Sequence, residues 1–486
     1  MGQRKNEHYN ALVIGAGPGG LVAAAGLAGL GARVGLFEKG RMGGDCLNTG
    51  CVPSKAVIAS ARVAHTMRTA ARHGLPAHDP PVDVAAVFAR MREVREQIAH
   101  HDAPERFESL GVEVFVGAPA VFTSPGTVEA NGRTYSADYF VIATGGRPAV
   151  PPIPGLRETP HYTNETFFDE LDASPGTLCV MGGGPIGIEM AQTMGRLGVR
   201  TTLVEMMDQI LVMEDADAAN VVQDALVADG VEMLTGHMVK SVAAGSPAAG
   251  PRAVRVQIEE KASGKTHERE FGALLVAVGR LPNVEQVGLE AAGVAFTRSG
   301  VTVDDKLRTA NKHIFAVGDV AGSYQFTHFA DAQARAVIRN ILIPWFPARF
   351  NAAVVPWCTY TDPECAHVGH NETTAKAAGL VFGVYRFEMA ELDRAIVDGH
   401  TEGFVKVIAD PKGRLLGATI VGAGAGDWIH EYVLAMKHGI TLPGISGTLH
   451  AYPTYGEASR RPADLFMKGK LTPTARRVLA RRWGRR

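Results

Sequence analysis

The sequence has few cysteines: its 486 residues contain only five. So few thiols in so long a chain cannot form the dense disulfide framework that holds small secreted domains together. A reducing compartment would not maintain such a framework either. We therefore expect any disulfide in this protein to take part in a reaction rather than to stabilise the fold.

The sequence also lacks an excess of either charge. Its 49 lysines and arginines are balanced by 50 aspartates and glutamates, for a formal net charge of -1. A chain with this balance produces no overall field that would attract nucleic acid or anionic lipid. We expect small molecules or proteins as partners, and no nucleic acid. The basic stretch 471–486 could touch acidic lipid or nucleic acid, but a solvated tail is the favoured interpretation.

Long apolar runs are absent, apart from residues 11–32, which carry no charged side chain. Seven glycines interrupt this run. They would weaken a lipid-embedded helix, whereas a strand, a tight turn and a closely packed helix need several of them. We therefore predict no membrane span and, since no targeting segment is apparent, a cytoplasmic protein.

The chain contains an internal repeat, because residues 14–38 align without a gap on residues 181–205. Each copy has an apolar run, a GxGxxG pattern, a helix-like stretch and a second apolar run that ends in glutamate, as in a βαβ unit. A single GxGxxG is weak evidence, but the same context occurs twice here. The glycines would let backbone amides approach a pyrophosphate, and the glutamates would accept hydrogen bonds from ribose hydroxyls. The predicted residues are Gly15, Gly17, Gly20 and Glu38 in the first copy, and Gly182, Gly184, Gly187 and Glu205 in the second.

The residues after Glu205 bear on the choice of nicotinamide nucleotide. Met206, Met207 and Val212 offer no cation for a 2′-phosphate, and a carboxylate at Glu205 would repel one. The sequence therefore favours NADH over NADPH.

The most specific stretch is residues 43–55, which contain Cys46, Cys51 and Lys55. Two cysteines five residues apart can close a small ring, and the start of a helix together with Lys55 would favour a thiolate at Cys51. The alternative is a pair of buried structural thiols. Glu189 of the second copy of the repeat stands where the first copy has Val22. Its carboxylate either interacts favourably with the positive N-terminal end of its own helix or forms an ion pair with Lys55 near the cofactor.

The other cysteines are predicted to pack in the core. Cys179 lies in an apolar strand, and the spacing of seven between Cys358 and Cys365 fits no usual pair of metal ligands. We predict no metal site.

These motifs resemble the class I pyridine nucleotide-disulfide oxidoreductases, the family of dihydrolipoamide dehydrogenase, glutathione reductase and mercuric reductase. The resemblance covers nearly the whole chain and includes the segments 143–145, 278–280, 309–319 and 360–364. It implies an α/β fold with two Rossmann-like dinucleotide-binding domains, as in glutathione reductase, and a C-terminal α+β dimerisation domain. The implied domains are residues 1–150 and 276–348 for FAD, 151–275 for NAD(P), and 349–470 for dimerisation, followed by the basic tail 471–486.

The resemblance also implies the chemistry and the partners. Electrons would pass from NAD(P)H through FAD to a Cys46–Cys51 disulfide and on to a thiol-reactive small molecule. Cys51 would touch the flavin, Cys46 would attack the acceptor, and a homodimer would share each active site across its interface. Further cofactor-binding residues implied in this way are Gly44, Lys55, Thr144, Gly145, Gly279, Arg280 and Asp319. The resemblance also implies a helix that starts near residues 326–329, with backbone amides that face the flavin.

The sequence departs from the family's disulfide reductases near the C-terminus. Five residues before Glu457, where they carry a histidine acid/base, this chain has Tyr452. Glu457 would hold the loop that carries Tyr452. Tyrosine titrates near pKa ~10 and histidine near ~6.5, so Tyr452 suits hydrogen-bond or proton donation better than general base work. His450 could substitute only if the loop turns it inward; otherwise it packs or hydrogen-bonds at the surface.

Mercuric reductases share the tyrosine, which favours a mercuric-reductase-like branch, although this chain lacks their C-terminal Cys-Cys pair and any N-terminal CxxC domain. A dihydrolipoamide dehydrogenase or a low-molecular-weight disulfide reductase is the alternative. An alternative of another class is a flavin-containing structural or adaptor subunit of a multienzyme complex. In the fold, we also expect one charged amphipathic helix over residues 84–110 and a hairpin loop at 244–252.

Overall fold

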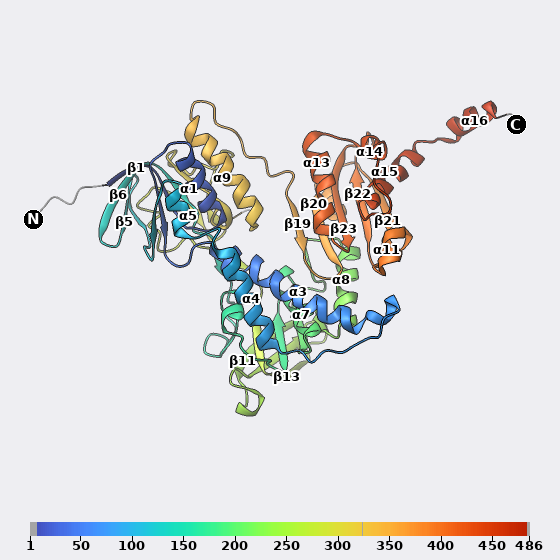
Figure 1. Cartoon of the computed structure of the whole chain (residues 1–486), viewed down its shortest axis with the longest axis horizontal. Coiled ribbons are helices and arrows are strands. Elements are labelled where there is room, and N and C mark those ends of the chain that lie inside the picture. The colour runs from blue at the N-terminus through green and yellow to red at the C-terminus, as the bar shows by residue number, and fades with distance from the viewer. Residues whose placement is uncertain (1–6, 323, 484–486) are drawn as a thin grey trace, which may run out of the picture.

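The computed structural model describes residues 7–322 and 324–483. Figure 1 shows three bodies joined around a central region: a first one at the left, a second one below and a third one at the right. Each is built around its own sheet, and α3 (Cys51–Arg68), packed beside α4 (Val84–Ala99), lies where the three meet.

The first sheet runs in the order β3-β2-β1-β6-β5-β4, with β18 added beside β6. Because β18 pairs in parallel with β6, the chain returns to this sheet long after leaving it. Close packing of α1 against α9 covers one face, where Gly26 lies against Ile338. The elements are β1 (Glu7–Ile14), α1 (Pro18–Gly29), β2 (Val34–Glu38), β3 (Val112–Val116), β4 (Val121–Ser124), β5 (Thr127–Ala130), β6 (Arg133–Ile142), β18 (Ile314–Ala316) and α9 (Thr327–Leu342).

The second sheet is parallel, in the order β10-β9-β8-β14, and an antiparallel sheet β11-β12-β13 packs beside it. The loop predicted at 244–252 joins β11 and β12, which pair as an antiparallel hairpin, so that prediction is confirmed. The elements are α6 (Asn164–Glu170), β8 (Thr177–Met181), α7 (Pro185–Arg196), β9 (Arg200–Glu205), α8 (Ala216–Ala228), β10 (Glu232–Thr235), β11 (His237–Ala244), β12 (Val254–Glu260), β13 (Thr266–Phe271) and β14 (Ala273–Val276).

The third sheet is antiparallel, in the order β19-β20-β23-β22-β21, and helices cover it. Its strands are β19 (Pro356–Thr359), β20 (Glu364–Gly369), β21 (Gly383–Glu388), β22 (Phe404–Ala409) and β23 (Leu415–Gly422). Its helices are α10 (Glu372–Ala377), α11 (Asp393–Asp398), α12 (Ala425–Trp428), α13 (His430–His438), α14 (Leu442–Ser446) and α15 (Glu457–Gly469), followed by α16 (Pro473–Arg482).

Short elements connect these bodies. They are α2 (Gly44–Asn48), β7 (Gly146–Pro148) paired with β15 (Arg280–Pro282), and β16 (Phe296–Thr297) paired with β17 (Gly300–Val301). In the described part of the chain, no helix is long and apolar enough to cross a membrane.

The prediction of a single helix over residues 84–110 is wrong. The structure has two helices there, α4 (Val84–Ala99) and α5 (Pro104–Ser109). Proline lacks an N–H and pushes the residue before it out of the helical region, and Ala103 is accordingly extended. Pro104 therefore begins a new helix.

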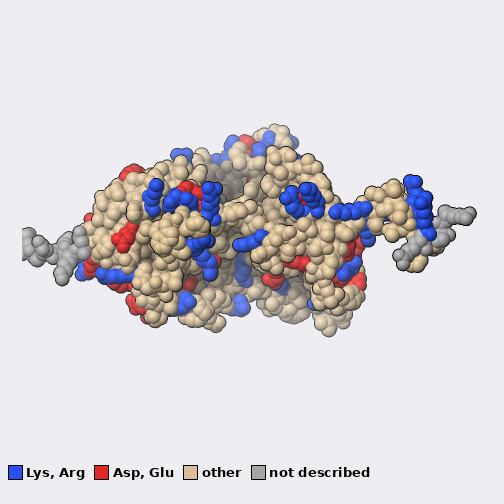
Figure 2. Space-filling model, turned by 90° about the horizontal axis from the view of Figure 1, so that it is seen from above, with Lys and Arg blue, Asp and Glu red and all other residues tan. Residues whose placement is uncertain are grey.

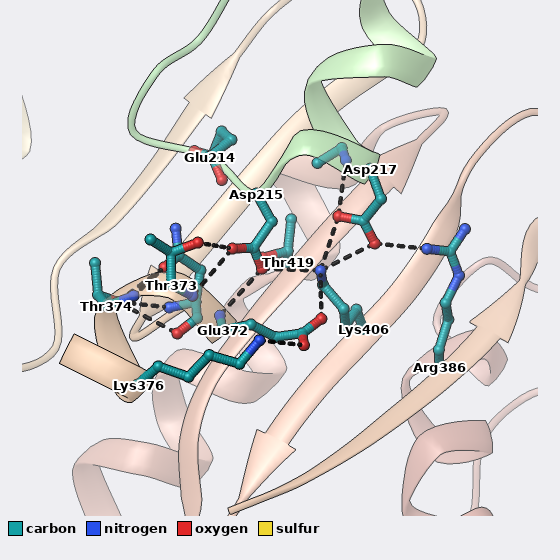
Figure 3. A network of polar contacts seen from close by, with 12 residues as sticks. Glu214, Asp215, Asp217, Glu372, Thr373, Thr374, Lys376, Arg386, Lys406 and Thr419 are labelled. Atoms are coloured by element: carbon teal, nitrogen blue, oxygen red, sulfur yellow. Dashed lines mark hydrogen bonds and ion pairs between the residues drawn. The ribbon is translucent and has the colours of Figure 1, made fainter. Parts of the chain in front are cut away.

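A buried ion cluster joins the second and third bodies (Figure 3). Lys406 of β22 is 3% exposed, and its Nζ lies 2.8 Å from Asp215 Oδ2, 2.8 Å from Asp217 Oδ1 and 3.1 Å from Glu372 Oε1. Asp215 also accepts hydrogen bonds from the amides of Glu372 and Thr373, at the start of α10. The start of α8 is thus fixed to the third sheet.

Candidate active site

One cavity of about 1630 Å³ connects the two glycine-rich loops and the cysteine stretch. Pockets for a single small ligand usually measure roughly 300–1,000 Å³. The cavity is therefore large enough for more than one such ligand, and both copies of the internal repeat open onto it.

Backbone geometry explains the first and last glycines of each GxGxxG. Gly15 and Gly182 have φ of +104° and +115°, where side chains are strained. A Cβ on Gly20 would lie 1.9 Å from the Gly15 carbonyl oxygen, and the same distance separates a Cβ on Gly187 from the Gly182 oxygen. These four glycines let strand, turn and helix pack together.

The middle glycines have a different environment. Nothing lies within 4 Å of a Cβ built on Gly184, and only the Cα of Gly44, at 3.9 Å, comes near one built on Gly17. Both residues line the cavity immediately before the first residue of a helix. Their open side is what a pyrophosphate needs to reach the helix N-terminus, so the loops fit FAD and a nicotinamide nucleotide.

The two glutamates hold their loops in the same way. Glu38 Oε2 accepts a hydrogen bond from the Ala16 amide at 2.7 Å, and Glu205 Oε2 accepts one from the Gly183 amide at 2.5 Å. Both carboxylates line the cavity. Each is thus fixed beside its glycine loop, where a ribose would meet it.

The expectation that no cation lies near Met206 is wrong. Lys261, from the turn between β12 and β13, donates a hydrogen bond from Nζ to the Met206 carbonyl oxygen at 2.9 Å. Because Lys261 is 55 residues further along the chain, the residues next to Glu205 did not reveal it. Lys261 does not line the cavity itself.

The two cysteines of the predicted redox pair face the cavity as free thiols. Cys46 lies in α2, and Cys51 is the first residue of α3. The Cys51 sulfur is 3.6 Å from the hydroxyl of Thr327, the first residue of α9. The positive ends of two helices therefore converge on Cys51, which favours a thiolate there.

The thiols differ in their protonation. A hydrogen bond from Cys46, opposed by burial and supported by Thr327 and Lys55, lowers the pKa of Cys51 to about 6. The same hydrogen bond, together with burial, raises the pKa of Cys46 well above its ordinary value. At neutral pH, Cys51 is the thiolate of the pair and Cys46 is the thiol.

Lys55 and Glu189 form the ion pair expected as one of two alternatives. Lys55 Nζ lies 2.9 Å from Glu189 Oε2, and Glu189 is 5% exposed. The Tyr360 amide donates to Glu189 Oε1 at 2.9 Å, and the Tyr360 ring lies 4.3 Å from Lys55 Nζ. The pair therefore holds β19, α3 and α7 together beside Cys51.

An arginine links the two sides of the cavity near Asp319. Arg280 donates hydrogen bonds to Asp45 and to Asp319, the latter at 3.3 Å. Burial raises the pKa of Asp319, although Arg280 opposes this. Gly279 and Gly145, with φ of +131° and +68°, also line the cavity.

Thr144 connects the cavity wall around Arg280 and Asp319 to the segment that follows β15 through hydrogen bonds with Asn283. Its hydroxyl donates to the Asn283 carbonyl oxygen at 2.8 Å, and the Asn283 side chain donates back to the Thr144 carbonyl oxygen at 2.9 Å. Gly44, with φ of +56°, packs against Gly17, since a Cβ there would lie 2.7 Å from the Gly17 Cα. The predicted FAD-side residues thus meet in one wall.

Three predicted catalytic residues do not line this cavity: Tyr452, His450 and Glu457. They belong to the segment between α14 and α15 and its junction with α15. Tyr452 is 68% exposed, and its hydroxyl donates to Asp393 Oδ2 at 2.8 Å. Within one protomer these side chains are not brought to the cysteines.

His450 and Glu457 have partners within the third body. His450 Nε2 lies 2.9 Å from Glu431 Oε1, and the imidazole is 9% exposed. Arg461 donates to Glu457 Oε1 at 2.6 Å. The His450 side chain thus points into the third body, where it contacts Glu431, and does not reach the cysteines of its own protomer. Glu457 forms its ion pair within α15.

Of the remaining thiols, Cys179 and Cys365 are buried and Cys358 is half-buried at the cavity wall. Burial raises the pKa of each. Among the described residues, no cluster of three or more His, Cys, Asp or Glu side chains is arranged to hold a metal ion.

Asp45, Thr327 and Tyr360 belong to the site but were missed as functional residues. Asp45 and Tyr360 lie inside stretches that the sequence singled out, so position in those stretches was an available signal. Thr327 had only its place at an expected helix start. Its contact with Cys51 joins residues 276 positions apart.

Two families of known proteins match the chain. The family described as pyridine nucleotide-disulphide oxidoreductase matches residues 9–334, and its dimerisation domain matches residues 355–463. The chain belongs to this family. It is therefore a flavoenzyme, an FAD-dependent NAD(P)H oxidoreductase with a redox-active disulfide, and the fold expected from the sequence is confirmed.

Individual relatives span the same architecture. A dihydrolipoyl dehydrogenase of Geobacillus stearothermophilus is 33% identical over 94% of this chain and 96% of its own. A mercuric reductase of Bacillus cereus is 32% identical over 95% of this chain and 72% of its own. The structure of the HOCl-induced flavoprotein disulfide reductase RclA from Escherichia coli superposes with a TM-score of 0.82 at 27% identity, covering 94% of this chain and 99% of RclA.

Proposed function

We propose that this flavoenzyme passes electrons from NADH, in preference to NADPH, through the Cys46–Cys51 pair to a thiol-reactive acceptor, as mercuric reductases do with Hg(II). Tyr452, at the place of the family's histidine, carries this proposal. The relatives do not choose between acceptors, because dihydrolipoyl dehydrogenases and mercuric reductases are about equally similar to this chain.

FAD would be held by the first glycine loop, Glu38, the Thr144–Gly145 turn and Asp319. When bound, FAD accepts hydride from the nicotinamide nucleotide and returns two electrons to a disulfide. Gly184 and Glu205 would hold the nucleotide. The Lys55–Glu189 pair would fix the charge beside Cys51, as its buried position and its contact with Tyr360 suggest.

The two thiols would divide the work. Cys51, with its pKa lowered to about 6, is the thiolate that faces the cofactor, and Cys46 is the thiol that meets the acceptor. A soft metal ion such as Hg(II) binds thiolates strongly. An acceptor of this kind needs no histidine to activate a leaving thiol, which is consistent with Tyr452.

The active site would be completed by a second protomer. We infer a homodimer from the dimerisation domain, in which Tyr452 of one protomer reaches the cysteines of the other. The exposure of Tyr452 and its absence from the cavity of its own protomer support this arrangement. Tyr452 would orient the bound acceptor, or donate a hydrogen bond or a proton to a thiolate that holds it.

An anaerobic titration tests the electron path. The purified yellow protein and its Cys46→Ser variant are reduced with NADH. The long-wavelength absorbance that arises from charge transfer between the Cys51 thiolate and the flavin is followed. Hg(II), lipoamide or glutathione disulfide is then added to separate samples. Loss of the absorbance with Hg(II) alone, together with release of Hg(0), supports the proposal, because Hg(II) bound to the thiolates without reduction would remove the absorbance but release no Hg(0). Bleaching of the flavin without this absorbance would contradict the disulfide path.

A small disulfide, such as lipoamide or glutathione disulfide, is the second candidate acceptor. The similarity to dihydrolipoyl dehydrogenases supports it, and it would require the His450 imidazole to leave its contact with Glu431 and serve as the acid/base for disulfide exchange. His450→Gln separates the candidates. Disulfide reduction would fall by at least about tenfold if His450 is the acid/base, and Hg(II) reduction would be unchanged if Tyr452 serves instead.

A further inference from the structure

The helix α16 is a surface element that the redox site does not use. It begins at residue 473, beyond the dimerisation-domain match, which ends at residue 463. Figure 1 shows α16 extending from the third body away from the rest of the molecule, and Figure 2 shows basic side chains gathered at that end. Among its described residues, none is buried. Packing within this chain therefore does not explain the helix.

Positive charge is concentrated at this end of the chain. Residues 465–486 contain eight lysines and arginines and no aspartate or glutamate, although the whole chain has a formal net charge of -1. The rest of the chain is therefore net acidic. An anionic surface would repel the body and attract the C-terminal end, so the molecule would approach such a surface with α16 first.

The helix also exposes large apolar side chains. Val478 is 60% exposed, Leu479 53% and Trp483 77%. Leu479 and Trp483, which follows the last residue of α16, are four residues apart and therefore neighbours on one side, which Arg476 borders three residues before Leu479, whereas Arg477 and Arg481 lie four residues apart on the other side. An acidic protein or nucleic acid would need only the arginines, but a lipid surface uses both faces, because tryptophan and leucine enter the headgroup boundary while arginines pair with phosphates.

We propose that α16 is a peripheral anchor that binds an anionic lipid surface. The protein would lie on the membrane without crossing it, with the cavity and the Cys46–Cys51 pair in the attached body. A single short helix gives weak, reversible binding that depends on salt, because each basic residue near the surface contributes roughly a fivefold gain in partitioning.

Vesicle sedimentation tests this proposal with the FAD-loaded protein. The vesicles are phosphatidylcholine alone or phosphatidylcholine with roughly one third phosphatidylserine. We expect binding only to the anionic vesicles, and a loss of that binding in high salt. Arg476→Gln with Arg477→Gln should lower partitioning about 25-fold, and Leu479→Gln with Trp483→Ser should lower it at unchanged charge.

The matched control is Arg335→Gln with Lys376→Gln, which removes two exposed cations elsewhere on the surface. This variant should bind as the wild type does, and all variants should keep NADH-dependent flavin reduction. Absence of wild-type binding to anionic vesicles would overturn the proposal. So would equal binding by the α16 and control variants, or conversion of the dimer to monomers after deletion of residues 471–486, which would assign α16 to a second copy of the chain.

Discussion

The hydroxyl of Thr327 lies 3.6 Å from the sulfur of Cys51, and each of these residues is the first of a helix. The contact brings together α3 of the cysteine stretch and α9, which follows the return of the chain to the first sheet. Both helix N-termini are oriented to stabilise negative charge, so Cys51 is held where a thiolate is favoured. Thr327 adds a hydroxyl that can donate to that thiolate.

Thr327→Val should raise the pKa of Cys51 from about 6 toward the ordinary value of a free thiol, because the variant removes the hydroxyl donor and keeps the shape. We expect a rise of about one pH unit or less, since the contact is long for a hydrogen bond. The thiolate exists above its pKa. The long-wavelength absorbance of NADH-reduced protein should therefore disappear as the pH falls through about 6 in the wild type and at a higher pH in the variant.

Thr327→Ser is the control for this measurement, because serine retains the hydroxyl. Its titration should match the wild type. An unchanged midpoint in Thr327→Val would show that the helix N-termini and Cys46 stabilise the thiolate without the hydroxyl.

Breaking the Lys55–Glu189 pair should affect stability and thiol chemistry separately. Lys55→Met leaves the Glu189 carboxylate buried without its cation, which we expect to cost about 2–3 kcal/mol and to lower the thermal midpoint by several degrees. It should also raise the pKa of Cys51, because Lys55 helps to lower it. Scanning calorimetry and the absorbance titration measure the two effects.

The double variant Lys55→Met with Glu189→Leu provides the test of this reasoning. It removes both charges, so most of the lost stability should return, and the Cys51 pKa should fall back from its value in Lys55→Met, because the Glu189 carboxylate raises it. A Cys51 titration that stays at the raised pH in the double variant would show that Glu189 does not act on the thiolate.

The fold was predictable because its strongest signals are local. In Gly15 and Gly20, backbone approach forbids any side chain, so the turn and the helix packing are visible in residue types alone. The same close approach recurs between Gly187 and Gly182 in the second copy. The prediction of one helix across residues 100–103 was wrong, although Pro104 marks the break, because a proline also occurs inside helices, such as Pro462 in α15.

The site was predictable only where it is contiguous. Cys46, Cys51 and Lys55 occupy ten residues of chain, so their common chemistry could be inferred from spacing. Thr327 and Lys261 reach their partners only through the packing of distant segments, and no periodicity encodes those contacts. The role of Tyr452 stays a prediction, because it depends on a surface contributed by a second protomer.

The ion cluster around Lys406 should be a major contributor to stability. Lys406→Met would leave the buried Asp215 carboxylate without its cation, whereas Asp217 keeps Arg386 and Glu372 keeps Lys376, and we expect a loss of about 3 kcal/mol at neutral pH. Burial opposes ionisation of Asp215, but Lys406 and the α10 amides hold its pKa below the ordinary value. In the wild type, this contribution is present at neutral pH and is lost as the pH falls through the lowered pKa.

In Lys406→Met, burial should dominate and raise the pKa of Asp215. The deficit relative to the wild type should then shrink as the pH is lowered, because protonation removes the unpaired charge. Thermal midpoints measured from neutral to acidic pH test this sign, and Lys376→Met, which removes an exposed partner of Glu372, is the matched control. A deficit that grows toward acidic pH would contradict the assignment.

The nucleotide preference should depend on Glu205 and on Lys261. Glu205→Ser removes a charged acceptor for the ribose hydroxyls, and we expect the KM for NADH to rise by about tenfold while the KM for NADPH falls. Lys261→Gln should leave the KM for NADH unchanged and raise the KM for NADPH, since Lys261 donates to the carbonyl oxygen of Met206, which lines the cavity. Steady-state kinetics with both nucleotides provide the comparison, and equal effects on both would contradict a role for Lys261 at the 2′ position.

The sharing of the active site between protomers can be tested by mixing two defective chains. Cys46→Ser alone should abolish acceptor reduction, and Tyr452→Phe alone should reduce it by about ten- to a hundredfold. If Tyr452 serves the partner's cysteines, a mixed dimer of the two variants contains one site with both native residues. Random assortment of equal amounts would then restore about a quarter of wild-type turnover, because half of the dimers are mixed and each has one intact site. This recovery of turnover requires the protomers to exchange between dimers, so turnover of the mixture is measured before and after unfolding and refolding. If turnover of the refolded mixture never exceeds that of the Tyr452→Phe variant alone, Tyr452 lies outside the partner's site.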